Sequence, residues 1–202
     1  RIDVLVNNAG YALIGPMIDL PIDDLRRQFE TNVIGLMALT KSVVPHMIKE
    51  RLGLVVNIAS VSGICATPFA GAYCSTKAAV NLLSTSLRIE LAPLGIDVVT
   101  VQPGAIKSDF GKAAIHNIRL SPKSVYTPLA RYIEARAMSS QKDPTSAEEF
   151  SSQLVDKLFS KRIPKIIRLG KSSTRLPLVA SLPAGRFDKI MTRMFGLDKL
   201  RP

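Results

Sequence analysis

Residues 54–83 read LVVNIASVSGICATPFAGAYCSTKAAVNLL, a short apolar run followed by a longer helical pattern. The run 54–58 is short, apolar and rich in valine, which is typical of a strand buried in a sheet. From residue 71 onward, apolar residues recur at spacings of three and four, and Pro93 ends the pattern: Val80, Leu83, Leu87 and Leu91. A buried strand followed by a helix predicts an α/β protein with a doubly wound parallel sheet.

Two further strands end in the same way as the first. The apolar segment 2–6 leads into Asn-Asn-Ala-Gly at 7–10, and the segment 96–101 leads into Gln-Pro-Gly at 102–104. Ser60 lies just beyond the end of the strand 54–58. Because parallel strands end at one edge of the sheet, where ligands bind, we expect these groups to lie close together.

Tyr73, Lys77 and Ser60 together predict acid-base chemistry on a carbonyl or alcohol. Tyr73 and Lys77 are four residues apart, so they share one face of the predicted helix. A free tyrosine has a pKa of about 10, and a neighbouring ammonium is expected to lower it. Such a tyrosine can protonate a carbonyl oxygen or deprotonate an alcohol, and the Ser60 hydroxyl can hydrogen-bond the same oxygen.

In their order and spacing, these residues resemble the classical branch of the short-chain dehydrogenase/reductase family, closely over residues 1–110. The resemblance implies a Rossmann-type fold and an enzyme that interconverts ketones and secondary alcohols. It also implies four catalytic residues: Ser60, Tyr73, Lys77 and Asn32. Asn32 begins an Asn-x-x-Gly motif and is expected to hold a water that links Lys77 to a proton relay.

The same resemblance implies a nicotinamide cofactor. The expected cofactor-binding residues are Asn7, Ala9, Gly10, Tyr73, Lys77, Pro103, Gly104, Ile106 and Ser108. Lys77 is expected to bind the ribose hydroxyls, and Ser108 stands where the family motif has threonine. NADPH is the expected cofactor, with NAD as the open alternative.

The glycine-rich pyrophosphate turn that opens the family's fold does not occur in the sequence, whose first strand matches the family's fourth. We therefore expect about 70 to 90 amino-terminal residues to be absent, the length of three strands and their crossovers. Residues 1–202 are then the carboxy-terminal, catalytic part of one domain. The segment 2–6 is expected to be an unpaired apolar edge, and this chain alone is expected to bind NADPH weakly.

Charge is unevenly distributed along the chain. Residues 1–110 hold nine basic and nine acidic residues, whereas residues 111–202 hold eighteen and seven, the whole surplus of +11. This surplus is either a solvated basic face or a site for an anionic partner, such as a phosphorylated substrate or an acidic membrane surface. If the substrate is an acylated phosphate, the basic residues between Lys157 and Arg175 are expected to contact the phosphate or the membrane that carries it. A nucleic-acid partner is not expected, because no recognition motif occurs and only 5% of residues are aromatic.

The carboxy-terminal half contains two segments of expected functional interest. The resemblance implies a substrate loop at 104–128. The residues themselves predict a helix over 146–160, with Glu148 and Glu149 in its first turn, and a short strand at 166–169. The basic and amphipathic tail, 171–202, carries five apolar residues on one helix face: Phe187, Ile190, Met191, Met194 and Phe195. This face packs on the domain, covers a lipophilic substrate or lies on a membrane surface.

The ending of the tail, residues 195–200, resembles the 1-acyldihydroxyacetone-phosphate reductase group of the family. That resemblance implies NADPH-dependent reduction of an acylated glycerone phosphate at the endoplasmic reticulum or lipid droplets. Retinol or hydroxysteroid dehydrogenases, and a catalytically silent relative that acts as an interaction module, are the alternatives. Self-association also stays open.

Cysteine and histidine usage indicates an intracellular, cytoplasmic protein without a metal site. Cys65 and Cys74 suggest no disulfide framework and a reducing compartment. His46 and His116 are isolated from other ligand-type residues, so no metal is expected. No apolar run approaches the 18 or so residues of a membrane span.

Overall fold

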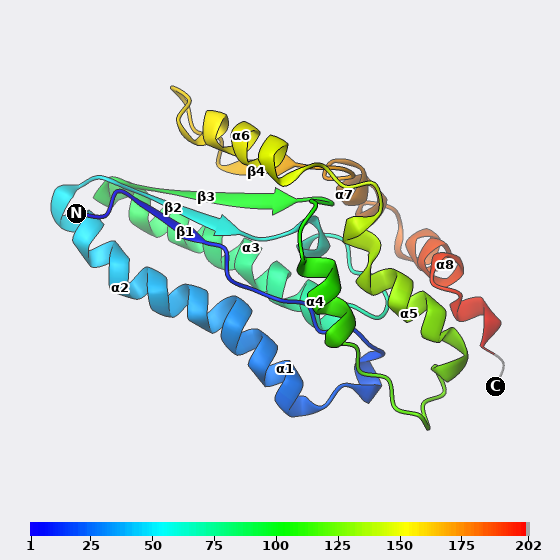
Figure 1. Cartoon of the computed structure of the whole chain (residues 1–202). Helices are drawn as coiled ribbons and strands as arrows, with labels where there is room; N and C mark the ends of the chain where they lie inside the picture. Colours follow the sequence, from blue (N-terminus) through cyan, green and yellow to red (C-terminus); the bar gives the residue numbers. More distant parts are fainter. Residues whose placement is uncertain (201–202) are drawn as a thin grey trace.

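The computed structural model describes residues 1–200 and contains a four-stranded, all-parallel sheet (Figure 1). The strands lie in the order β1, β2, β3 and β4, with bounds Val4–Asn7, Gly53–Ile58, Ile96–Pro103 and Ile166–Leu169. The predicted α/β class with a parallel sheet is confirmed.

Helices cover both faces of this sheet. The helices α2 (Gly35–Glu50) and α3 (Gly71–Leu91) pack on one face, and α6 (Ala147–Leu158) packs on the other (Figure 1). The remaining α-helices are α1 (Ile22–Phe29), α4 (Phe110–His116), α5 (Ala130–Ala137), α7 (Arg175–Ala180) and α8 (Ala184–Met194). A π-helical turn, Glu30–Ile34, joins α1 to α2. Short 3₁₀ turns lie at Met17–Asp19, Val61–Gly63, Ala92–Leu94, Thr127–Leu129, Ser139–Gln141 and Leu197–Lys199.

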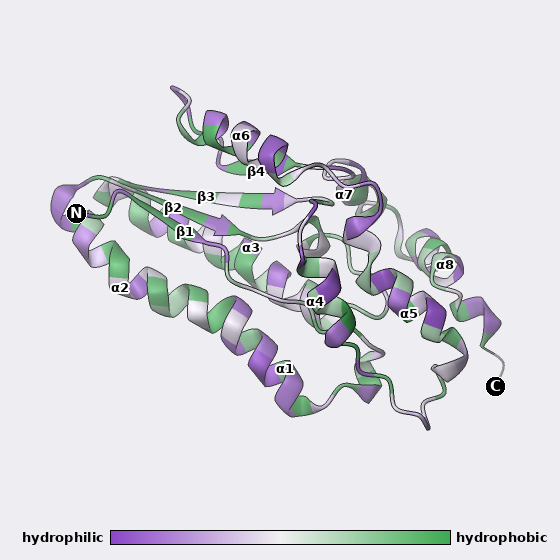
Figure 2. Cartoon of the chain, viewed as in Figure 1, coloured by the Kyte–Doolittle hydropathy of each residue, from purple (hydrophilic) through white to green (hydrophobic). Residues whose placement is uncertain are grey.

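Alternating strand residues build the two halves of the core. Leu5, Val55 and Val98 pack against α2 and α3, whereas Leu54 and Val56 pack toward α6. Successive side chains of a strand point to opposite faces, so a strand covered on both faces is apolar throughout. Along α2, apolar bands alternate with hydrophilic ones, as expected for a helix with one buried side (Figure 2).

The strand β1 lies at one edge of the sheet and is only half covered. Leu5 and Asn7 are buried, but Val4 and Val6 are 38% and 50% exposed. Among the described residues β1 pairs with β2 alone. The expectation of an exposed apolar edge at residues 2–6 is therefore confirmed.

Four helices gather beyond the carboxyl ends of the strands: α4, α5, α7 and α8 (Figure 1). The segment 104–128, expected to be a substrate loop, contains α4, whose seven residues are too few to show a clear sequence period. Backbone bridges attach Ala105 to Lys171 and Ile106 to Thr145, so this segment is fixed to the tail and to the start of α6.

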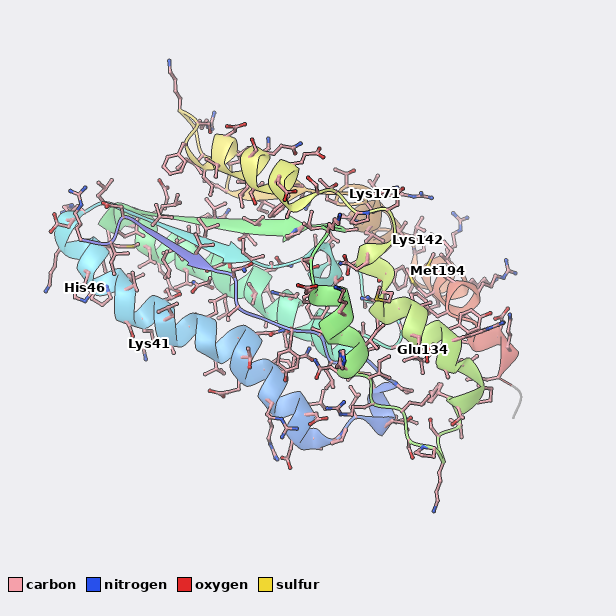
Figure 3. All side chains as sticks on the ribbon, viewed as in Figure 1. Lys41, His46, Glu134, Lys142, Lys171 and Met194 are labelled. Atoms are coloured by element: carbon pink, nitrogen blue, oxygen red, sulfur yellow. The ribbon has the colours of Figure 1, made fainter. Side chains whose placement is uncertain are left out.

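The apolar face of the tail helix α8 is divided between core and solvent. Phe187, Met191 and Phe195 pack into the same apolar cluster as Tyr73. Ile190 and Met194, 38% and 59% exposed, lie outside it, and Figure 3 shows Met194 at the surface of α8. The sequence left open whether this helix face packs on the domain, covers a substrate or lies on a membrane. Three of its five apolar residues pack on the domain.

This division predicts a contrast between two neighbouring substitutions. Phe195 is buried with its ring 6.2 Å from that of Phe69, so Phe195→Asp is expected to cost about 3–5 kcal/mol of unfolding free energy. Met194→Asp, at an exposed position, is expected to stay within about 0.5 kcal/mol of the parent. Urea unfolding of both variants checks this, and equal losses would contradict the packing of α8.

Candidate active site

Ser60 lies two residues beyond β2, at the edge where the strands end. Its side chain caps the 3₁₀ turn Val61–Gly63, and its Oγ accepts a hydrogen bond of 3.1 Å from the Ser62 backbone N–H. Serine is a preferred residue at such a cap. The Ser60 hydroxyl can therefore still donate its own hydrogen, as a group that binds a carbonyl oxygen must do.

Close packing of α3 on this turn places Tyr73 and Lys77 beside Ser60. A Cβ atom on Gly63 would lie only 2.5 Å from the backbone carbon of Lys77, so the turn and the helix approach each other as closely as glycine allows. The Ser60 hydroxyl lies near enough to the Tyr73 phenol to help lower its pKa. The structure therefore brings together three of the predicted catalytic residues.

Tyr73 is almost completely buried. Its ring packs on that of Phe110, with 5.5 Å between ring centroids, and 8% of the residue is exposed. Burial raises the pKa of Tyr73 to about 12, against smaller lowering effects of the Ser60 hydrogen bond and the Arg136 charge. The expectation that Lys77 lowers the pKa of Tyr73 is therefore wrong for this structure, because the desolvation of the phenol dominates.

Lys77 is also buried, which lowers its pKa to about 8. Its Nζ donates a 2.7 Å hydrogen bond to the Ile58 carbonyl and lies 5.9 Å from the Tyr73 ring centroid. Among the described residues Ile58 is the one acceptor of this ammonium, which has three N–H donors. Two donors are left for hydroxyl groups such as those of a ribose.

Asn32 connects the loop after β1 to α3. Its Oδ1 accepts from the Tyr11 N–H at 3.0 Å, and its Nδ2 donates to the Tyr11 carbonyl and the Thr76 hydroxyl at 2.9 and 3.0 Å. The Thr76 hydroxyl in turn donates to the Tyr73 carbonyl at 2.8 Å. Asn32 lies in the π-helical turn, a feature that is frequent at functional sites. Its predicted role in holding a relay water stays a prediction.

Gly10 brings the loop after β1 close to this group. A Cβ atom there would lie 3.1 Å from Asn32 Oδ1 and 3.6 Å from Lys77 Nζ. Ala9 and Gly10 are both exposed, so their backbone is accessible to a ligand at the sheet edge. Exposed backbone next to an ammonium with unused donors fits the nicotinamide half of a cofactor.

The Asn7 side chain points into the protein. Its Nδ2 donates to the Thr40 hydroxyl at 3.0 Å and to Asn57 Oδ1 at 2.8 Å, and Asn57 Nδ2 donates to Ser84 Oγ at 2.9 Å. This buried network joins β1 and β2 to α2 and α3. We did not predict it, although Asn57 within the apolar run of its strand is the sequence signal for it.

The segment after β3 passes beside Tyr73. A Cβ atom on Gly104 would lie 2.0 Å from the Lys171 carbonyl oxygen, so the tail crosses closely over this position. Ser108 donates its backbone N–H to Gln141 Oε1 at 3.2 Å, and the Ile106 carbonyl accepts from Gln141 Nε2 at 3.1 Å. Pro103, Gly104, Ile106 and Ser108 thus lead from the sheet edge to Phe110, and their contacts to the cofactor stay predictions.

The first four basic residues of the segment 157–175 lie away from this site. Lys157, Lys161, Arg162 and Lys165 lie on the last turn of α6 and in the turn before β4, at the amino end of that strand (Figure 1). Tyr73 is at the opposite edge, so these four residues are not placed to contact the phosphate of a substrate that reacts at Tyr73, and a contact with a membrane surface stays a prediction. Lys171 lies nearer the site but forms an ion pair with Asp143.

The comparisons with known proteins agree with this geometry. Residues 1–118 match the short chain dehydrogenase family model. The uncharacterized oxidoreductase YusZ of Bacillus subtilis is 34% identical over 181 residues, covering 87% of this chain and 64% of YusZ. The crystal structure of a short-chain dehydrogenase from Streptomyces avermitilis superposes with a TM-score of 0.77 at 30% identity, covering 98% of this chain and 70% of that one.

A third comparison concerns a structure with a cofactor. The ElxO variant with NADPH bound is 38% identical with a TM-score of 0.52, covering 53% of this chain and 44% of that one. This chain thus spans less than two thirds of the length of YusZ and of ElxO. The chain belongs to the short-chain dehydrogenase/reductase family, the NAD(P)-dependent oxidoreductases with this Rossmann-like fold.

Proposed function

We propose that the whole protein uses NADPH to reduce a ketone on a lipophilic substrate, with NAD as the alternative cofactor. The observation that carries this proposal is the Ser60 and Tyr73 pair, placed under an apolar cluster at the carboxyl edge of the sheet. Phe110, Ile133 and Phe195 contribute to that cluster from α4, α5 and the end of α8.

The residues of the site divide the work of this reaction. When bound, the nicotinamide supplies a hydride for the carbonyl carbon. Ser60 donates a hydrogen bond to the carbonyl oxygen, and Tyr73 donates a proton to it. Because burial raises its pKa to about 12, Tyr73 is protonated at neutral pH and has the proton that the carbonyl oxygen needs. Lys77 and the backbone of Gly10 hold the cofactor, and Asn32 fixes the loop that carries Gly10.

For the substrate, our first choice is 1-acyldihydroxyacetone phosphate, and a retinoid or steroid is the rival. An apolar cluster that includes Phe69, Tyr126 and Phe195 supports an acyl chain or another extended hydrocarbon next to the reacting carbonyl. All three substrates combine an extended hydrocarbon with a carbonyl group. They differ in the polar group that each carries, so recognition of that group decides between them.

An acylated substrate also suggests where the protein acts. None of the helices in residues 1–200 combines the length and the apolar character that a membrane crossing needs. Exposed Ile190 and Met194 lie on α8 beside exposed Lys189 and Arg193, a combination that suits the surface of an anionic membrane such as that of the endoplasmic reticulum or a lipid droplet. Reduced flotation of Met194→Asp with anionic vesicles would support this, and unchanged flotation would oppose it.

A panel of two ketones and one aldehyde tests the proposed function. Consumption of NADPH by the whole protein is measured with 1-acyldihydroxyacetone phosphate, retinal and a steroid ketone, each over a range of concentrations. We expect kcat/KM to be highest for the acylated phosphate. A preference for retinal or the steroid would select the rival substrate, and no consumption with any of them would indicate a catalytically silent relative.

A further inference from the structure

Arg136, on the last turn of α5, is a half-buried cation near the reactive tyrosine. Its Nε donates a 2.8 Å hydrogen bond to the Thr67 hydroxyl, and its Nη1 donates a 3.0 Å hydrogen bond to the Ser139 hydroxyl. Its helix neighbours Ile133 and Ala137 belong to the apolar cluster that covers Tyr73. Arg136 therefore lies at the rim of the space proposed for the substrate.

Arg136 takes no part in the ion pairs that the described residues form. A charge removed from water without an opposite charge is costly, so such a cation usually has a partner. The guanidinium has five N–H donors in a planar fork that matches a carboxylate or a phosphate, and two of them are used by Thr67 and Ser139. Three donors are left for an anion.

The position of Thr67 ties this cation to the reacting centre. The Thr67 hydroxyl lies 3.8 Å from the sulfur of Cys74, which follows Tyr73 on α3. The positive charge of Arg136 lowers the pKa of the Tyr73 phenol and of the Cys65 thiol, although burial outweighs it at both groups. A ligand on Arg136 would thus lie on the side of α3 from which Thr67 approaches Cys74, the residue that follows Tyr73.

Other basic residues of this half of the chain have different surroundings. Lys171 forms an ion pair with Asp143. Arg131 and Lys199 flank the exposed phenol of Tyr132 at the outer side of α5. Neither group has the Thr67 contact that connects Arg136 to the start of α3.

We propose that Arg136, together with the hydroxyls of Thr67 and Ser139, binds an anionic group of the substrate whose carbonyl is held by Ser60 and Tyr73. The group is a carboxylate or a phosphate, and the proposal rests on the proposed ketone reduction. In this proposal Arg136 binds the anion. The residues near Lys157 and Lys165 do not, because the fold places them at the opposite edge of the sheet.

Three ketones of equal chain length test this subsite: one ends in a phosphate, one in a carboxylate and one in a neutral methyl ester. In Arg136→Gln, KM is expected to rise about 10- to 100-fold for the anionic ketone that the parent binds more tightly, because charge-assisted hydrogen bonds are lost. The kcat and the KM for the neutral ester are expected to change less than about twofold, since Arg136 does not touch the reacting carbonyl. The anionic ketone with the larger rise in KM shows whether the subsite binds a phosphate or a carboxylate.

Two further variants serve as controls. Arg136→Lys keeps the charge without the planar fork and is expected to recover part of the affinity for the anionic ketone. Arg131→Gln removes a cation from the same helix and is expected to leave KM for all three ketones unchanged. Equal losses for anionic and neutral ketones in Arg136→Gln would show that Arg136 only clamps α5 to Thr67, and would overturn the proposal.

A binding measurement separates this proposal from the proposed function. If the protein reduces none of the ketones, the proposed function fails, and the subsite is tested by titration with inorganic phosphate and with butyrate. NMR signals of the arginine Nε–H groups are then followed. A saturable shift at Arg136 but not at Arg131 keeps the subsite, and no shift at Arg136 with either anion overturns it.

Discussion

Tyr73→Phe is expected to lower kcat for ketone reduction by about 10² to 10⁴-fold, the usual contribution of a positioned general acid. Phenylalanine keeps the ring that packs against Phe110, so the fold and the affinity for NADPH are expected to change little. Steady-state rates, combined with fluorescence titration of NADPH, measure the two effects separately in the whole protein.

Tyr126→Phe is the matched control, because Tyr126 packs on Phe69 in the same apolar cluster but does not belong to the group of Ser60, Tyr73 and Lys77. It is expected to keep kcat within about twofold of the parent, as a tyrosine with no role in the chemistry would. Substantial turnover by Tyr73→Phe, or an equal loss in Tyr126→Phe, would mean that Tyr73 is not the acid.

Lys77→Met is expected to abolish most activity and, at neutral pH, to stabilise the fold. Burial lowers the pKa of Lys77 from 10.5 to about 8, so the unfolded chain binds the proton more tightly than the folded chain between these values. Stability of the parent should therefore rise with pH across this range, by up to about 3 kcal/mol. Below about pH 8 the full cost of the buried ammonium is present, and Lys77→Met removes that cost.

Urea unfolding at a series of pH values measures this effect. The parent is expected to gain stability from about pH 8 upward, and Lys77→Met is expected to lack this rise. Above about pH 10 the raised pKa of Tyr73 acts in the opposite direction, because the unfolded phenol ionises first. Lys41→Met, at an exposed site on the outer side of α2, is the control (Figure 3). Parallel pH profiles for the parent and Lys77→Met would contradict the buried ammonium.

The order of strands and helices could be predicted because their patterns are local. The apolar runs 2–6, 54–58 and 96–101 became β1, β2 and β3, and the spacing of leucines after residue 71 became α3. The edge of the sheet followed from topology, since parallel strands place their carboxyl ends together. Ser60 and Tyr73 were therefore predicted to meet, and in the structure the Ser60 hydroxyl is near enough to the Tyr73 phenol to affect its pKa.

The electrostatics of the site could not be read from spacing. The four-residue interval between Tyr73 and Lys77 indicated a lowered tyrosine pKa, but the tertiary packing that buries both groups has the larger effect. Arg136 was missed because α5 reaches Thr67 through a contact between residues 69 positions apart. The alternation along β1 turns the Asn7 side chain inward, into a buried network that its motif did not indicate.

The most direct test of the central claim, that Tyr73 protonates the substrate carbonyl, is a crystal structure of the whole protein with NADP⁺ and an unreactive ketone analogue. We expect the carbonyl oxygen to lie about 2.6–3.2 Å from both the Tyr73 and the Ser60 hydroxyl oxygens. Phe110 is expected to have moved aside from the Tyr73 ring, on which it packs in the present structure. A ketone bound elsewhere, with Tyr73 still covered by Phe110, would contradict the claim.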